Sequence, residues 1–192
     1  MQELKDRIVK EGKVLPGNII KVDGFLNHRI DTELMDHIAE EFGKHFNMDE
    51  VTMILTAEAS GIALSAIVAH HFHKPMIFAK KAKSDNIEGG LYQSDIFSYT
   101  YKKKVTLLVS KEWLSADDQV LIIDDFMANG EARRGLGDIV TAAGATLVGI
   151  GCAVEKGFQG GGDRLRAAGV NLKSLAIIES AEPGNIVFRG ED

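Results

Sequence analysis

Apolar residues along this chain follow two spacings, one typical of helices and one typical of buried strands. Helical spacing is clearest at Leu34, Ile38 and Phe42, where Asp31 or Thr32 could cap the first turn. Further helical patterns cover about residues 62–72, 133–143 and 163–168. Apolar runs of strand length cover about residues 51–56, 76–79, 104–110, 120–123, 146–154, 175–178 and 186–188. Strands that alternate with helices predict an α/β fold with a mainly parallel sheet covered on both faces.

Length and composition narrow the class of protein. The 192 residues predict a single domain with a substantial core, and 45% hydrophobic with 26% charged residues is ordinary for a globular protein. The net charge of −6 argues against a general nucleic-acid binder, which normally carries a basic surplus. No apolar stretch is long enough to cross a bilayer, and Glu58 interrupts the nearest candidate. We therefore expect neither nucleic acid nor a membrane as a partner.

The first residues and the single cysteine bear on the compartment. The segment from Met1 to Asp6 is too charged for a secretory signal. Cys152 has no second cysteine to pair with, so an internal disulfide is impossible and a reducing cytoplasm is compatible. It lies in an apolar run, which favours a buried, unreactive thiol over a nucleophile. These features predict a cytoplasmic protein.

The most informative segment runs from Val120 to Ala132 and reads VLIIDDFMANGEA. Its apolar run stops at Asp124 and Asp125, a short turn with Gly130 follows, and a helical pattern opens next. The N–H groups at a helix N-terminus bind anions. The two carboxylates would repel a phosphate, but they can accept hydrogen bonds from sugar hydroxyls or help to hold a divalent cation. The combination predicts a site for a phosphorylated sugar.

A structural explanation of the same segment is a buried strand followed by an acidic turn and a capped helix. That explanation would be preferred for the Asp-Asp pair alone. The ordered combination of thirteen residues favours the sugar-phosphate site, because chance agreement over such a length is rare.

This segment resembles the phosphoribosyl-pyrophosphate (PRPP) signature of type I phosphoribosyltransferases, and the similarity extends over nearly the whole chain. The resemblance implies that family's fold, a mainly parallel twisted sheet flanked by helices, with a small hood from about residues 1–35 and 180–192. It also implies that Asp124 and Asp125 hold the ribose hydroxyls of PRPP. The residues expected to wrap its 5′-phosphate are Ala128, Asn129, Gly130, Glu131 and Ala132.

Two residues of this loop depart from the ideal chemistry of a phosphate site. The carboxylate of Glu131 should not face a phosphate, so we expect its side chain to turn outward while its backbone N–H contributes. Ala132 lacks the hydroxyl that many relatives carry there, so its contact would be through the backbone alone.

A second strand-to-helix turn follows the apolar run at residues 51–56 and reads Glu58-Ala59-Ser60-Gly61. It resembles the pyrophosphate loop of the family, and the resemblance assigns Ser60 and Gly61 to PRPP. Lys81 follows the next strand and is assigned to the leaving pyrophosphate, from its own chain or from a partner's. A plain turn and a solvated lysine would explain these residues almost as well without the other motif.

The residues expected to bind the nucleobase come from two distant segments. The segment from Ile20 to His28 resembles the hood of bacterial family members that act on xanthine, with Ile20 as an apolar wall and Asn27 at the base edge. After the strand that ends at Val154, the family places a lysine on the purine C6 oxygen and an aromatic ring on the base. That assigns Lys156 and Phe158. Core packing and a turn lysine are the structural alternatives.

Two segments have less specific patterns. Residues 160–162 are three glycines without a phosphate fingerprint, and they predict a flexible turn. The polar, Lys-rich interval of about residues 81–104 is long for a loop in a compact domain. The resemblance implies a mobile lid over PRPP, and a solvated surface hairpin remains an equal alternative.

Taken with the resemblance, the residues imply a purine-salvage glycosyltransferase that joins PRPP and xanthine to give xanthosine 5′-monophosphate (XMP) and pyrophosphate. The family further implies Mg²⁺ bound with PRPP and a homodimer. Guanine and hypoxanthine stay open as bases, with adenine less favoured, because a lysine ammonium would face the amino group of adenine. From another class, a PRPP-sensing regulatory domain without catalytic activity also stays open.

Overall fold

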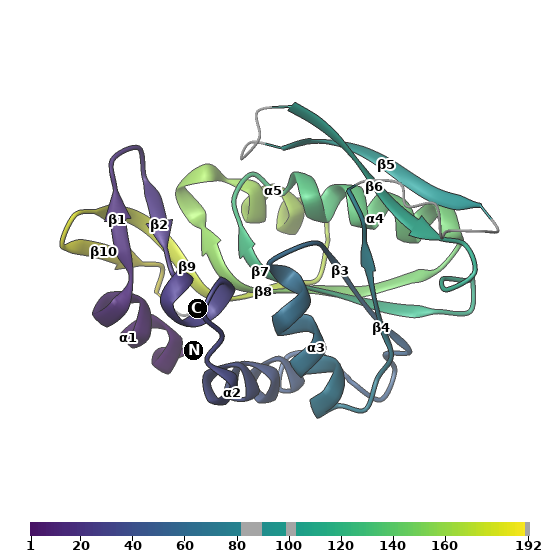
Figure 1. Cartoon of the computed structure of the whole chain (residues 1–192), viewed down its shortest axis with the longest axis horizontal. Coiled ribbons are helices and arrows are strands. Elements are labelled where there is room, and N and C mark those ends of the chain that lie inside the picture. Colours follow the sequence, from purple (N-terminus) through teal and green to yellow (C-terminus); the bar gives the residue numbers. More distant parts are fainter. Residues whose placement is uncertain (82–89, 99–102, 191–192) are drawn as a thin grey trace.

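A six-stranded sheet forms the centre of the molecule in the computed structural model, which describes residues 1–81, 90–98 and 103–190. The strand order is β10-β9-β8-β7-β3-β4, and all neighbours are parallel except β10, which is antiparallel to β9 (Figure 1). In chain order the strands are β3 (Met53–Ala57), β4 (Met76–Ala79), β7 (Gln119–Met127), β8 (Thr146–Lys156), β9 (Leu172–Glu182) and β10 (Asn185–Phe188). The predicted mainly parallel sheet is therefore present.

Helices cover both faces of this sheet, and β7 shows why. Leu121 and Ile123 belong to one buried cluster, while Val120 and Ile122 belong to the other. Because successive strand residues point to opposite faces, a continuous apolar run feeds two cores. Helices α2 (Thr32–Gly43) and α3 (Gly61–His71) pack on the first face, and α4 (Glu131–Ala143) packs on the second (Figure 1). The side chain of Asp31 caps α2 by accepting a hydrogen bond from Leu34 N at 3.2 Å.

The N-terminal elements lie beside β9 and β10 at one end of the sheet (Figure 1). They are α1 (Gln2–Glu11), the antiparallel strands β1 (Lys13–Leu15) and β2 (Ile19–Lys21), and a π-helical turn, η1 (Asp23–Asn27). Helix α1 was not expected from the sequence. It has three apolar residues in ten, of which it buries only Leu4 and Ile8, and this gives too weak a periodicity to predict a helix.

An antiparallel hairpin lies over α4. It consists of β5 (Leu91–Ser98) and β6 (Lys103–Ser110), and a bridge between Lys80 and Leu108 ties it to the end of β4. Helix and hairpin approach closely because Gly135 has no side chain; a Cβ there would lie 2.4 Å from Ile96 Cγ2. The expected lid at residues 81–104 falls partly on this hairpin, and residues 82–89 and 99–102 lie outside the described residues.

Three local expectations differ from the structure. Strand β7 does not stop at the acidic pair but continues to Met127, because β8 still provides hydrogen-bonding partners beyond the last β3 pair. Helix α4 begins at Glu131 rather than Arg133. The three glycines do not form a free turn: a 3₁₀ turn, η2 (Gly157–Gln159), leads into α5 (Gly161–Ala167), whose first two residues are buried glycines. Among the described helices, none has both the length and the apolar character needed to cross a membrane.

Candidate active site

A cleft of about 360 Å³ opens where β3, β7 and β8 reach their carboxyl ends. This is the edge at which open α/β sheets bind their ligands. All the residues predicted from the sequence line it, except Gly61 and Phe158. The lining also includes Ala57, Glu58, Ile96, Phe97, Phe126 and Arg133, which carried no assigned role in the sequence analysis.

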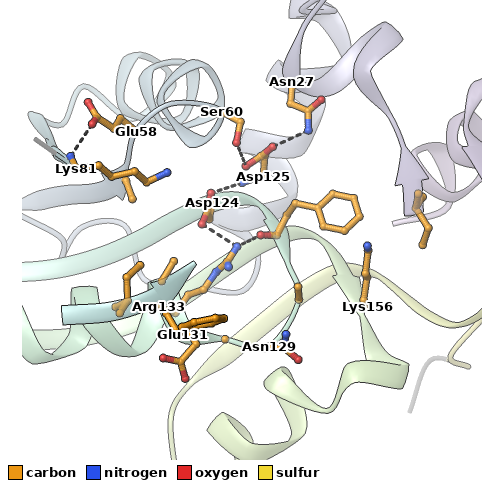
Figure 2. Close-up of a pocket in the computed structure, with 18 residues that line it drawn as sticks. Asn27, Glu58, Ser60, Lys81, Asp124, Asp125, Asn129, Glu131, Arg133 and Lys156 are labelled. Carbon is orange, nitrogen blue, oxygen red and sulfur yellow. Dashed lines mark hydrogen bonds and ion pairs between the residues drawn. The ribbon is translucent and has the colours of Figure 1, made fainter. Parts of the chain in front are cut away.

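Asp125 joins three segments that are far apart in the sequence (Figure 2). Its side chain is buried within β7, and the residue is 1% exposed. The Ser60 hydroxyl donates to Oδ1 at 2.9 Å, and the Asn27 amide nitrogen donates to Oδ2 at 3.0 Å. Each carboxylate oxygen is therefore engaged, one by the loop before α3 and one by the N-terminal turn η1.

Asp124 is held by a buried arginine. Arg133 Nη2 lies 2.7 Å from Asp124 Oδ2, and the same nitrogen donates to the Phe126 carbonyl. The Asp125 backbone N–H donates to Asp124 Oδ1 at 2.9 Å. Burial raises the pKa of Asp124 to about 7, although the Arg133 guanidinium opposes that rise. The contact of Arg133 with Asp124 could not be predicted from the sequence, where the only local signal is a cation in the first turn of the helix that follows the motif.

The loop from Ala128 to Ala132 turns the chain from β7 into α4. Gly130 has a φ of 81°, a left-handed conformation that favours glycine, and it caps α4. The first N–H groups of α4 have no partner within the helix, and helix ends of this kind suit an anion. The Glu131 carboxylate is paired with Arg134, whose Nη2 lies 3.1 Å from Oε2. That pairing satisfies the carboxylate through a neighbour on the same helix.

The second loop runs from Glu58 to Gly61, with a cis peptide bond between Glu58 and Ala59. Glu58 Oε1 accepts a hydrogen bond from the Lys81 backbone N–H at 2.5 Å, and the Lys81 side chain extends into the cleft (Figure 2). Gly61 lies beneath the acidic pair instead of lining the cleft. A Cβ on Gly61 would lie 2.3 Å from Thr56 Oγ1 and 2.7 Å from Asp124 Oδ1. Glycine therefore lets α3 start directly against the carboxylate.

On the far side of the cleft, Lys156 stands at the end of β8. Its Nζ lies 5.4 Å from the centre of the Phe126 ring and donates to the Asn18 carbonyl at 3.2 Å. Burial lowers the pKa of Lys156. Phe158 is absent from the cleft lining and packs against the core, so Phe126 is the aromatic residue beside Lys156. Ile20 and Asn27 complete this side from the N-terminal elements.

The donor set suits a divalent cation that brings most of its own ligands. Within the described residues, no three His, Cys, Asp or Glu side chains gather as a metal-binding group. Asp124 and Asp125 supply carboxylate oxygens, the ligands that Mg²⁺ prefers, but Arg133, Ser60 and Asn27 already contact them. Such an arrangement fits Mg²⁺ chelated by substrate phosphates, with at most one or two protein oxygens added.

Comparison with known proteins gives consistent matches. A family model described as the phosphoribosyl transferase domain matches residues 25–168. Xanthine phosphoribosyltransferase of Lachnoclostridium phytofermentans is 53% identical over 193 residues, covering 100% of both chains. The protein of the same name from Bifidobacterium longum is 53% identical over 192 residues, covering 98% of this chain and 100% of that one.

Solved structures agree on the fold. The adenine phosphoribosyltransferase of Giardia lamblia complexed with 9-deazaadenine superposes with a TM-score of 0.78 at 22% identity, covering 93% of this chain and 98% of that chain. The Trypanosoma brucei enzyme in complex with AMP, pyrophosphate and ribose-5-phosphate gives 0.73 at 21% identity, covering 91% and 78%. At these identities the likeness concerns the fold, and it confirms the predicted fold class.

Proposed function

The chain belongs to the phosphoribosyltransferase family, and from that membership we propose that it is a xanthine phosphoribosyltransferase. It transfers the 5-phosphoribosyl group of PRPP to N9 of xanthine, giving XMP and pyrophosphate, a reaction of purine salvage. The observation that carries the proposal is the cleft in which two buried carboxylates lie between two helix N-termini. Full-length relatives at 53% identity carry the name of this activity.

The sugar-phosphate half of PRPP is assigned to β7 and the loop that follows it. Asp124 and Asp125 accept hydrogen bonds from the ribose hydroxyls. The N–H groups of the loop bind the 5′-phosphate, with contributions from Ala128, Asn129, Gly130, Glu131 and Ala132. This assignment is supported by the left-handed Gly130 at the start of α4 and by the pairing of Glu131 with Arg134.

The pyrophosphate group is assigned to the second loop. Ser60 supplies a hydroxyl, which donates to Asp125 in the structure and would turn to the ligand. Gly61 allows the start of α3 to approach closely, and Lys81 supplies positive charge from within the cleft. Mg²⁺ bound together with PRPP would supply further positive charge to the leaving pyrophosphate. Lys81 acts either in its own subunit or across an interface with a partner, depending on how the chains assemble.

The nucleobase is assigned to the opposite wall. Xanthine carries oxygen at both C2 and C6, so its pocket needs hydrogen-bond donors. The Lys156 ammonium and the Asn27 amide supply them, Ile20 packs on one side, and Phe126 takes the stacking role first expected of Phe158. Guanine and hypoxanthine share the C6 oxygen, so Lys156 alone does not separate them from xanthine.

The residues act by holding and shielding the reactants. As the bond from C1 of the ribose to pyrophosphate breaks, the lone pair of N9 forms the new bond and the base releases a proton. Positive charge develops on the ribose ring in this step. The carboxylates of Asp124 and Asp125 stabilise that charge without forming a covalent bond. Orientation between the two loops and exclusion of water supply the rest of the rate enhancement.

The test is a panel of bases. Purified protein with PRPP and Mg²⁺ is mixed separately with xanthine, guanine, hypoxanthine, adenine and uracil, and nucleotide formation is followed by chromatography. Xanthine should give the highest kcat/KM, and Asp125→Asn should reduce turnover strongly, whereas the exposed Asp117→Asn should not. Nucleotide from uracil alone would contradict the base assignment. PRPP binding without turnover on any base would favour the sensor alternative.

Two further properties complete the proposal. The buried single cysteine, Cys152, fits a reducing compartment, and we place the enzyme in the cytoplasm. We also propose a homodimer. The support for a homodimer is an apolar groove beside β4, the edge strand of the sheet, where Phe78 and Trp113 are exposed.

A further inference from the structure

Helix α5 lies directly against the backbone of the phosphate loop. A Cβ on Gly161 would lie 2.3 Å from the Ala128 carbonyl oxygen, 2.6 Å from Asn129 C and 2.8 Å from Gly130 N. All three atoms belong to the backbone, so they could not move aside without shifting the loop. Glycine is therefore required at this position, and the three-glycine segment has a structural purpose that its sequence alone did not indicate.

A side chain from the same helix holds the loop at a second point. Arg164 Nη2 donates to the Asn129 carbonyl oxygen at 3.0 Å, and Nη1 lies 3.5 Å from the Gln159 carbonyl oxygen. In a trans peptide the C=O and N–H groups point in opposite directions. Because Arg164 holds the Asn129 carbonyl towards α5, the N–H of Gly130 in the same peptide is turned away from α5.

Helix α5 is itself anchored to the sheet, so it can act as a support. Arg166 makes two hydrogen bonds to the fully buried Glu155, Nη2 to Oε2 at 2.7 Å and Nη1 to Oε1 at 3.1 Å. Ser174 of β9 donates to the same carboxylate. Gly162 permits this contact, since a Cβ there would lie 2.0 Å from Glu155 Oε1. The support thus joins β8 and β9 to the loop through one short helix.

We propose that Gly161 and Arg164 are positioning residues for the 5′-phosphate of PRPP, which fix the phosphate loop from behind so that the Gly130 N–H faces the ligand. The inference rests on the proposed function, because it takes the loop between β7 and α4 as the phosphate site. Neither residue lines the cleft. Both act through backbone groups of residues 128–130, and the positive charge of Arg164 beside this loop also attracts an anion.

The experiment separates the two anionic halves of PRPP. Ribose 5-phosphate carries the 5′-phosphate, whereas inorganic pyrophosphate occupies the other loop, and calorimetry measures each affinity. For Arg164→Met we expect about tenfold weaker ribose 5-phosphate binding, the scale of one lost charge-assisted hydrogen bond. For Gly161→Ala we expect a loss at least as large, because the loop backbone must shift to admit the Cβ. Pyrophosphate affinity should stay within twofold of wild type. A general loss of structure would weaken the binding of both ligands together. The ratio of the ribose 5-phosphate affinity to the pyrophosphate affinity therefore reports the positioning of the phosphate loop.

Two control variants match these changes. Gly137→Ala adds the same methyl group to α4, where nothing lies within 4 Å of the new Cβ. Lys10→Met removes one exposed positive charge from α1. Both should bind ribose 5-phosphate as wild type does. Arg164 is exposed, so its variant remains informative even if Gly161→Ala fails to fold.

Selective loss of ribose 5-phosphate binding supports the proposal for each residue that shows it. A variant whose affinity for ribose 5-phosphate stays within twofold of wild type removes that residue from the proposal. An equal loss of affinity for both ligands also overturns the proposal, since the positioning of one loop would not affect binding at the other. Wild-type protein that binds neither ligand would contradict the proposed function itself.

Discussion

At the residue scale, the ion pair of Asp124 and Arg133 sets two effects against each other. Removal from water raises the pKa of Asp124 to about 7, and the guanidinium 2.7 Å away favours the ionised form. A carboxylate accepts hydrogen bonds at both oxygens, whereas a protonated carboxyl group presents a donor at one of them. The ability of Asp124 to accept bonds from ribose hydroxyls therefore changes near neutral pH.

We expect PRPP to bind more weakly as the pH falls from about 8 to about 6, because Asp124 takes up a proton over that range. Calorimetric titrations at a series of pH values measure the effect. The phosphates of PRPP also change protonation with pH. Asp124→Asn therefore serves as the reference, because the pH dependence of its PRPP affinity comes from the ligand and not from residue 124. Identical pH dependence in wild type and in this variant would show that Asp124 does not control affinity.

Arg133 compensates a charge that the fold buries. Removing one partner of a buried pair leaves the other uncompensated, so Arg133→Met should lower the free energy of unfolding by about 3–5 kcal/mol. Its neighbour Arg134 makes exposed pairs, and Arg134→Met should cost less than about 1 kcal/mol. Urea denaturation measures both. Asp124→Asn should recover part of the loss in the Arg133→Met background, and a simple sum of the two losses would argue against the coupling.

Asn27 serves as a donor to Asp125 before any ligand arrives. Ribose hydroxyls must compete with its amide for the same oxygen, while xanthine needs that amide as a donor. Asn27→Ala should therefore change the two affinities in opposite directions: PRPP binding tightens a few-fold, and xanthine binding to the PRPP complex weakens about tenfold. Equilibrium binding of PRPP and of xanthine tests this. Weakening of both would mean that Asn27 only supports the hood.

At the scale of elements, the β5–β6 hairpin contributes both to the buried cluster on the α4 face of the sheet and to the cleft. It packs on α4, and Ile96 and Phe97 of β5 reach the cleft lining. A hairpin that lines the cleft on one side and packs on α4 on the other is suited to cover a ligand in the cleft. The lid predicted at residues 81–104 remains a proposal, and its described part is this hairpin.

Hydrogen exchange tests the lid. We expect amides of β5 and β6 to exchange more slowly when PRPP and Mg²⁺ are bound, because closure reduces local opening. Helix α2 lies on the opposite face of the sheet and should exchange at the same rate in both states. An unchanged rate across residues 91–98 and 103–110 would identify a surface hairpin without a covering role.

At the scale of the whole molecule, the parts of the fold that the sequence predicts are those with strong local signals. The buried strands β3, β4, β7 and β8 are continuous apolar runs, and the Asp31 cap is read from a short segment. Strand β5 gives a weak signal because few of its residues are buried. The sequence signal of helix α1 is also weak, because few of its residues are buried and its stability depends on packing against β9.

The site divides in the same way. The place of residues 124–132 at the cleft could be predicted, because one continuous segment carries both the carboxylates and the loop that follows β7. That the Phe126 ring lies beside Lys156 could not be predicted, nor could the direction of the Phe158 side chain in the turn η2, since both depend on tertiary packing. The bond from Asn27 to Asp125 joins residues 98 positions apart, and that between Lys156 and Asn18 spans 138. Such contacts depend on how distant elements meet.

The assembly of the molecule can be argued from its surface. Phe78 and Trp113 are 37% and 61% exposed, and they line an apolar groove with Met76 and Val109 beside the edge strand β4. An exposed sheet edge next to apolar side chains is prone to pair with another chain. A two-fold dimer would bury the same patch on both subunits and lie close to Lys81 at the cleft.

We therefore expect light scattering after gel filtration to give twice the mass of one chain for the wild type, and the mass of one chain for Phe78→Ser combined with Trp113→Ser. Val9→Ser is the matched control, because Val9 is 63% exposed on α1 and lies outside the groove. It should remain a dimer. A monomeric wild type would contradict the proposed homodimer, and a double variant that stays dimeric would move the interface to another surface. If monomers form and lose turnover and pyrophosphate binding while ribose 5-phosphate still binds, the pyrophosphate site is completed by the partner subunit, as expected if Lys81 acts across the interface.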